Sequence, residues 1–331
     1  VLLLRWFVPQ VFFYGVITVL TALLQARRHF AAAAFAPVLN NVVVIVTYLV
    51  ARRVSSLDLT VAALGEVQNE RWTMLVLGLG TTLGVVANAV VLFSSVGRAR
   101  IRLRPVFDRH HPAMARLAVA ARGALGYVLV SQIGVTVTSL LANRFKQTGG
   151  YASWTYANLV FYVVYGLLVV SITTAIGPEL AHAAQQDDLA TVRREWVRGL
   201  RLIVLLMAPV AAGAGVLAGP LWQALPLDQG GVVLTAVIFR WFTIGLLPFS
   251  VIQHVVRAYY ALAETRPPFR VAVLQNVLVV GAGVVASPVF GVAGLAAAYA
   301  VGYLVTAVVA FSWFAHRLGR LRHSEVRPVP R

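Results

Sequence analysis

The sequence contains no cysteine among its 331 residues, and it is poor in charge. The absence of cysteine excludes disulfides, thiolate metal sites and a cysteine nucleophile. Charged residues make up 12% of the chain and hydrophobic residues 60%, whereas soluble domains are roughly 25% charged. So little polar surface cannot cover a water-soluble globule. The composition therefore excludes a soluble enzyme, a disordered tail and a secreted disulfide scaffold.

Acidic residues are scarce as well, because 11 Asp and Glu stand against 28 Lys and Arg, for a net charge of +17. In a soluble protein this excess would suggest nucleic acid, but in a membrane protein it reports on loop topology. The motifs of serine hydrolases, zinc proteases and nucleotide-binding loops are missing. Glu179 is the only acidic residue expected near a span interior. We therefore predict no enzyme activity, no cofactor and no metal site.

Long apolar segments dominate the chain. A bilayer core about 30 Å thick needs roughly 20 apolar residues in a helix, and open strands cannot cross it. We predict an all-α integral membrane protein with about nine transmembrane helices. The nine segments are 1–24, 31–51, 72–96, 113–142, 151–176, 199–218, 232–262, 271–286 and 289–315.

Basic residues are concentrated in alternate connections between these segments. The connections 25–34, 97–112, 181–201 and 263–270 and the tail 316–331 hold 18 Lys and Arg, whereas the opposite connections hold 5. Because basic loops stay in the cytoplasm, we predict an outside N-terminus and a cytoplasmic C-terminus. The first span begins at once, so we expect an N-terminal part with an odd number of spans to be missing. A genuine start on the outside is the alternative.

Two helical hairpins of the sequence resemble each other. Pro9 and Asn40 flank one tight basic turn, and Pro248 and Asn276 flank another. The hairpins begin with the first and seventh segments, so both run from outside to inside. Parallel repeats of this kind are typical of transporters whose substrate path lies between the halves. Chance similarity of two apolar hairpins is the alternative.

Polar side chains inside the spans are the candidate site, because their burial is costly unless they face a cavity. Arg240 and Arg122 lie within the seventh and fourth segments, where each either faces a cavity or snorkels to the headgroups. His254 and Arg257 share one helix face near the cytoplasmic end, where headgroup contact is the simpler interpretation. Amides in spans bond either neighbouring helices or substrate. They are Asn40, Asn41, Asn88, Gln132, Asn158, Gln253, Gln275 and Asn276.

Several stretches resemble one known family. Residues 5–15 read RWFVPQVFFYG, residues 24–30 read LQARRHF and residues 35–41 read FAPVLNN. These stretches resemble the MurJ/MviN lipid II flippases of the multidrug/oligosaccharidyl-lipid/polysaccharide exporter superfamily. TAIGPEL at 174–180 and RAYYALAETRPP at 257–268 are similar to further motifs of that family, so the resemblance covers nearly the whole chain. The residues that it marks as structural are Pro9, Arg28, Phe30, Pro37, Asn40, Arg257, Arg266 and Pro267.

The resemblance implies two helical bundles in a V-shaped exporter arrangement, with the first bundle incomplete. Residues 1–96 would be the remnant of that bundle, 97–112 a basic cytoplasmic linker, 113–315 the six-helix second bundle and 316–331 a basic cytoplasmic tail. The implied activity is flipping of lipid II from the inner to the outer leaflet of the plasma membrane by alternating access. The implied partners are an anionic lipid-linked sugar, membrane lipids and cell-wall synthesis proteins, but no nucleic acid. The composition bias looks actinobacterial.

The charged site of the family does not carry over to this chain. Where the family reads Y-A-D-R-L, residues 156–160 read YANLV, so Asn158 and Leu159 replace an acid and an arginine. Tyr162 replaces the acid further along that helix, and Thr138 replaces an Asp that is frequent in the preceding span.

A pyrophosphate in a low-dielectric site still needs a cation. We therefore expect Arg240 or Arg122 to bind the substrate, with Asn158 and Gln132 as further contacts. The alternatives are a flippase for another lipid-linked polysaccharide, a drug exporter, a non-transporting scaffold for cell-wall synthesis and a membrane enzyme.

Overall fold

The computed structural model describes residues 2–27, 29–55, 70–99, 101, 112–145, 149–224 and 229–325. In this part of the chain all regular structure is helical, and the chain divides into two compact units, Val1–Phe107 and Asp108–Arg331. Eight of the described helices are long and apolar enough to cross a membrane. The last of them turns back on itself, so they make nine passes. The predicted all-α membrane architecture is confirmed.

The first unit consists of α1 (Leu2–Ala26), α2 (Phe30–Val54) and α4 (Arg71–Arg98), with α4 packed against both others. Two short polar contacts join α1 to α4. The Gln10 amide donates to the Thr82 hydroxyl at 2.8 Å, and that hydroxyl donates to the Trp6 carbonyl at 2.9 Å. The apolar core of the unit consists of Leu20, Leu24, Ala36, Leu92 and Val96.

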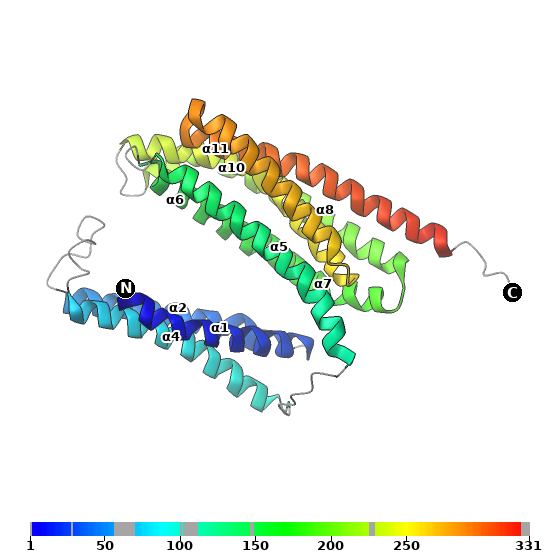
Figure 1. The fold of residues 1–331 in the computed structure, drawn as a ribbon, viewed down its shortest axis with the longest axis horizontal. Coiled ribbons are helices and arrows are strands. Elements are labelled where there is room, and N and C mark those ends of the chain that lie inside the picture. The colour runs from blue at the N-terminus through cyan, green and yellow to red at the C-terminus, as the bar shows by residue number, and fades with distance from the viewer. Residues whose placement is uncertain are drawn as a thin grey trace. The chain divides into compact units, whose positions relative to one another are not determined.

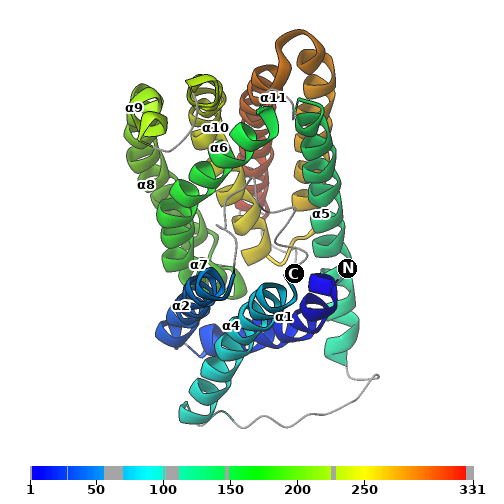
Figure 2. The same ribbon diagram turned by 90° about the vertical axis from the view of Figure 1, so that its left-hand side faces the viewer.

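The second unit is a bundle of six passes, one of which is a central helix. Its elements are α5 (Pro112–Asn143), α6 (Gly150–Tyr165), the π-helical turn η2 (Gly166–Val170), α7 (Ser171–Gln185), α8 (Leu189–Val216), α9 (Ala218–Gln223), α10 (Gln229–Ala261) and α11 (Arg266–Glu325). The stretch α6, η2 and α7 forms one continuous pass. Figure 2 shows α10 between α8 and α11, and its side chains are the most buried of any pass in the described residues. This burial makes α10 the core of the bundle.

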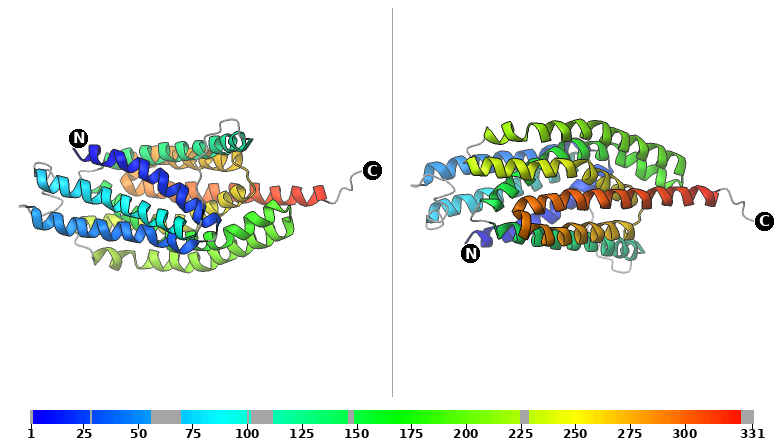
Figure 3. Two further views of the ribbon diagram at one scale, coloured as in Figure 1. Left: turned by 90° about the horizontal axis from the view of Figure 1, so that it is seen from below. Right: turned by 90° about the horizontal axis from the view of Figure 1, so that it is seen from above.

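The longest helix, α11, contains a sharp reversal at Gly291. A helix of its 60 residues would be about 90 Å long if straight, far more than a bilayer core. Gly291 has φ 61° and ψ −145°, a conformation that side chains other than glycine rarely adopt. The chain therefore reverses here, and Figures 1 and 3 show this turn at the opposite end of the unit from the α7–α8 turn. The two predicted segments 271–286 and 289–315 are the two arms of α11.

The start of α8 differs from the sequence-based expectation. We expected a connection over 181–201, but α8 begins at Leu189, because the Asp188 carboxylate accepts the Thr191 backbone N–H at 3.0 Å and caps the helix. The hydrogen bonds that Asp188 receives from the Thr191 side chain and backbone lower the pKa of its carboxyl. The expected tail is also partly helical, because α11 extends to Glu325.

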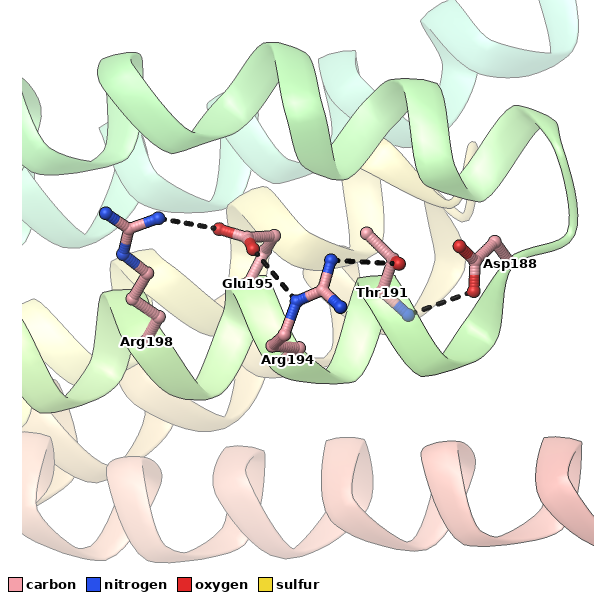
Figure 4. A network of polar contacts seen from close by, with 5 residues as sticks. All are labelled: Asp188, Thr191, Arg194, Glu195 and Arg198. Atoms are coloured by element: carbon pink, nitrogen blue, oxygen red, sulfur yellow. Dashed lines mark hydrogen bonds and ion pairs between the residues drawn. The ribbon is translucent and has the colours of Figure 1, made fainter.

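One acidic residue is buried in the amphipathic first turns of α8, a stretch that was expected to be a connection. Glu195 is only 8% exposed, which corrects the expectation that Glu179 alone approaches an interior. Figure 4 shows the Glu195 carboxylate between two arginines of the same helix, Arg194 at 3.3 Å and Arg198 at 3.5 Å. The two ion pairs give the carboxylate partners where its helix packs against the bundle.

Glycines of α5 pack closely against the first arm of α11 and the residue before it. A Cβ on Gly134 would fall on the Asn276 side chain, 2.6 Å from its Cγ atom. Gly123 and Gly126 face Thr265 and Phe269 in the same way. Small residues permit this approach, as is usual for helices packed in a membrane.

Candidate functional site

A cavity of about 160 Å³ lies inside the second unit. Four elements line it: α5, α6, α10 and α11. The lining residues are Tyr127, Ser131, Val135, Tyr162, Phe249, Gln253, Gln275, Asn276, Val279, Tyr299 and Tyr303. We name it the tyrosine–amide cavity. Among the described residues that line it there is no charged side chain.

Aromatic packing fixes one wall of the tyrosine–amide cavity. The ring centroids of Tyr299 and Tyr303 are 5.3 Å apart, and those of Tyr303 and Phe249 are 5.0 Å apart. Trp154 of α6 packs edge-on to Tyr299 at 5.1 Å. Such tilted and edge-to-face contacts are the favoured geometries of aromatic pairs. Tyr162 meets Phe249 at 6.1 Å and is 45% exposed, so it forms the open rim of this wall.

Neutral hydrogen bonds hold the polar groups around the cavity. The Tyr299 hydroxyl bonds Thr138 at 2.9 Å, and the Gln253 amide donates to the Tyr127 hydroxyl at 3.4 Å. The Asn276 amide nitrogen donates to the Ala272 carbonyl at 2.8 Å. Thr138, which stands where the resembled family often has an Asp, thus has a neutral structural role here.

The four predicted substrate contacts do not share a cavity in the described residues. Arg240 is exposed and lines an open groove of about 590 Å³ between α8 and α10, among alanine, glycine and aliphatic residues. Arg122 and Gln132 are both exposed on α5. Asn158 is partly buried, and its amide donates to the Trp154 carbonyl of its own helix at 3.5 Å. None of the four lines the tyrosine–amide cavity.

His254 is a packing residue, and the expected headgroup contact of this histidine is wrong. Its side chain is 3% exposed, and its Nε2 atom donates to the Trp196 carbonyl at 2.9 Å. The ring stacks on Trp196 with a centroid distance of 5.9 Å and an interplanar angle of 9°. Gly199 leaves room for this ring, because a Cβ there would lie 2.6 Å from its Cε1 atom. Sequence reasoning missed the contact because Trp196 was assigned to a loop.

Arg257 lies at a second cavity, of about 220 Å³, between α7 and α10. The arginine is partly buried and lies near Tyr165, the last residue of α6. Gln253, four residues earlier on the same helix, lines the tyrosine–amide cavity. Residues four apart on a helix share one face, so this arginine is one turn from the neutral cavity.

The remaining family-motif residues have structural positions. Asn40 lies against Gly84 of α4, since a Cβ on this glycine would be 2.7 Å from the Asn40 Oδ1 atom. Pro9 and Pro37 are exposed within α1 and α2. Arg266 and Pro267 open α11, where proline is favoured because the first helical N–H groups have no partner within the helix. Phe30 opens α2, and Arg28 lies outside the described residues.

Two features of the second unit were not anticipated from the sequence. One is the tyrosine–amide cavity itself, for which tyrosines recurring in apolar spans were an available signal. The other is a surface hollow of about 720 Å³ at the start of α8, lined by the exposed arginines of the predicted basic connection: Arg193, Arg194, Arg198 and Arg201. Both features depend on packing that the hydropathy pattern does not encode.

Comparison with known proteins decides the family. The profile of the family described as "Lipid II flippase MurJ" matches residues 1–327. The chain belongs to this family. It is 28% identical over 322 residues to "Probable lipid II flippase MurJ" of Haemophilus influenzae, covering 94% of this chain and 58% of the relative. It is 26% identical to "Lipid II flippase MurJ" of Burkholderia cenocepacia, covering 97% of this chain and 60% of the relative. The chain therefore spans less than two thirds of the length of these MurJ relatives.

Solved structures show the same fold. "Lipid II flippase MurJ, inward closed conformation" superposes with a TM-score of 0.62 at 17% identity, over 94% of this chain and 62% of that one. "Crystal structure of MATE in complex with MaL6" superposes with a TM-score of 0.80 at 13% identity, over 97% of this chain and 70% of that one. The multi-span exporter fold expected from the sequence is confirmed, together with membership of the MurJ family.

Proposed function

We propose that this chain flips a lipid-linked peptidoglycan precursor, lipid II, from the inner to the outer leaflet by alternating access. A diphosphate–sugar head cannot cross hydrocarbon unaided, because burying its charge and its hydroxyls without partners is prohibitive. The observation that carries the proposal is a polar cavity within a bundle of apolar, span-length helices of a MurJ-family chain. No covalent bond is made or broken, so the activity is transport and not catalysis.

We infer that the basic end of the second unit faces the cytoplasm. The described arginines near that end are Arg193, Arg194, Arg198, Arg201, Arg266, Arg270 and Arg317. At the opposite end the described residues include Arg144. By the positive-inside rule this distribution supports a cytoplasmic C-terminus and an N-terminus on the outside. Cell-wall synthesis proteins are proposed partners because the chain belongs to the MurJ family.

Two arginines on α10 are candidates for the anionic part of the substrate. Arg257 lines a cavity and is one turn from Gln253 of the tyrosine–amide cavity, whereas Arg240 lies in an exposed groove. We therefore propose Arg257 as the contact for the diphosphate. Arg240, the candidate from sequence, remains the alternative.

The test is transport of fluorescent lipid II in vesicles that contain the purified chain. Transport is read as the fraction of label protected from an added quencher over time. A charged hydrogen bond contributes about 1.5–3 kcal/mol, so Arg257→Gln should slow transport roughly 10-fold or more, while Arg240→Gln stays within about twofold. If Arg240→Gln slows transport and Arg257→Gln does not, Arg240 is the contact for the diphosphate. No transport by the unaltered chain would overturn the proposed function.

A second candidate is a non-transporting membrane scaffold for cell-wall synthesis. It is favoured by the exposed, uncharged Leu159 and the self-bonded Asn158 at the positions of the family's charged pair. The scaffold predicts that cell-wall enzymes co-purify with the chain while the vesicle assay shows no transport.

A further inference from the structure

The tyrosine–amide cavity is chemically unsuited to the charged part of a lipid-linked substrate. Its described lining has rings, hydroxyls and amides but no cation. Placing a diphosphate there would bury unpaired charge, which costs several kcal/mol even after relaxation. An occupant of this cavity must therefore be polar and uncharged.

The polar groups of the cavity can bond a ligand rich in hydroxyls. In the described structure the Gln275 amide and the hydroxyls of Tyr162 and Tyr303 have no hydrogen-bond partner. The carbonyl oxygen of Asn276 makes no hydrogen bond in the described structure, and it lies beside Gly134 of α5 at the edge of the cavity. Together these groups offer both donors and acceptors, as sugar hydroxyls require.

The aromatic wall supplies the matching apolar surface. The faces of aromatic rings are electron-rich and attract the weakly positive C–H groups of a flat ligand. Tyr299 and Tyr303 are held by neighbouring rings at 5.1 and 5.0 Å, respectively, whereas Tyr162 is half exposed at the rim. Fixed rings on one side and a half-exposed ring at the opening suit a flat ligand that enters the cavity with its edge first.

We propose that the tyrosine–amide cavity binds an uncharged sugar ring of the lipid-linked substrate. Tyr162 stacks on the ring, and Gln275 and Asn276 bond its hydroxyl or amide substituents. The inference rests on the proposed function. The cavity measures about 160 Å³, below the roughly 300–1,000 Å³ of sites that enclose a whole drug-sized ligand. It therefore holds one ring and leaves the rest of the head outside.

The experiment is saturation-transfer NMR on the purified full chain in detergent. The probe is the methyl glycoside of N-acetylglucosamine, and inorganic pyrophosphate is the charged competitor. Saturation should reach the ring C–H protons of the probe, and pyrophosphate should not displace it. Tyr162→Leu and Gln275→Leu should each weaken binding at least fivefold.

Tyr156→Leu is the matched control. Tyr156 is on the same helix and is 37% exposed, against 45% for Tyr162, but it does not line the cavity. Its replacement should leave binding unchanged. Tyr303→Phe removes one hydroxyl and keeps the ring, so a weaker probe signal from this folded variant would support the site even if Tyr162→Leu misfolds.

The outcomes separate this inference from the proposed function. Sugar binding that depends on Tyr162 but comes without transport would keep the site and reject flipping. Transport that proceeds equally well in Tyr162→Leu, Gln275→Leu and Tyr303→Phe would reject the site and keep flipping. Displacement of the probe by pyrophosphate, or equal binding by all variants, would overturn the sugar site.

Discussion

Gly134 and Asn276 provide the sharpest test of how the second unit is packed. In Gly134→Ala the new methyl carbon would overlap the Asn276 side chain, with the Cγ atom only 2.6 Å away. Carbon atoms pack best at about 3.5–4.0 Å, so one of the two groups must move by about 1 Å. Asn276 does not move without cost, because its amide donates to the Ala272 carbonyl at 2.8 Å.

The expected loss of stability follows from the overpacking at Gly134 and from the hydrogen bond of Asn276. Overpacking of a close interface costs about 1–3 kcal/mol, and a broken neutral hydrogen bond costs about 0.5–1.5 kcal/mol, at the lower end of that range. For a unit of this size, each kcal/mol shifts the unfolding midpoint by about 2–4 °C. Gly134→Ala should therefore lower the Tm by roughly 2–12 °C. The measurement is thermal unfolding of the purified chain in detergent, followed by tryptophan fluorescence.

Gly213→Ala is the matched control, because no atom lies within 4 Å of the added Cβ at this α8 position. Alanine there should be neutral or stabilising by about 0.5–1 kcal/mol, since glycine is the more flexible residue in a helix. The double variant Gly134→Ala with Asn276→Ala should unfold close to Asn276→Ala alone, because the clash is gone. If Gly134→Ala unfolds no lower than Gly213→Ala, the described contact between α5 and α11 is wrong.

Further predictions concern topology, pH and the cavity wall. Single cysteines replacing Asp187 in the α7–α8 turn and Val289 near the α11 turn should label with an impermeant maleimide from opposite sides of the membrane; labelling of both from one side would refute the bundle orientation. The lowered pKa of Asp188 means that its contribution to stability is present above the ordinary carboxyl pKa and is lost as the pH falls through its folded pKa. The acid limb of the stability–pH curve should therefore flatten in Asp188→Asn, and an unchanged limb would contradict the cap. Thr138→Val and Tyr299→Phe should each cost about 0.5–1.5 kcal/mol, with a double variant that costs less than their sum; strict additivity by the same unfolding assay would mean that the bond is absent.

The passes of the bundle could be predicted from sequence because burial in lipid leaves a long apolar signature. The same signature failed at the start of α8, where Glu195, Arg194 and Arg198 interrupt the hydropathy but not the helix. An Asp188 cap and buried residues at helical spacing, Val192, Trp196 and Gly199, continue the helix through this charged stretch. Hydropathy alone therefore placed the start of this helix too late, whereas the helix cap and the periodicity of buried residues would have placed it correctly.

The candidate site was harder to predict, because depth along a span does not say which way a side chain points. Arg240 is deep by position yet lies in an exposed groove, whereas His254, near the helix end, is buried against Trp196. The rotation of α10 decides both outcomes, and it is set by contacts with α6, α8 and α11 that are far away in sequence. The neutral replacements at Asn158 and Leu159 were visible from the sequence, but the tyrosine–amide cavity was not.

A neutral interior has a mechanistic consequence under the proposed function. An uncharged sugar ring can enter the tyrosine–amide cavity at little electrostatic cost, while the diphosphate attached to the head cannot follow without a cation. Arg257, one helical turn from Gln253, is the described arginine that lines a cavity on the same helix. Binding of the head would then be divided along α10, with neutral recognition at Gln253 and charge pairing at Arg257. Because the two groups are on one rigid helix, any movement of α10 that opens the sugar cavity also moves the cation, so release of both parts of the head is coupled.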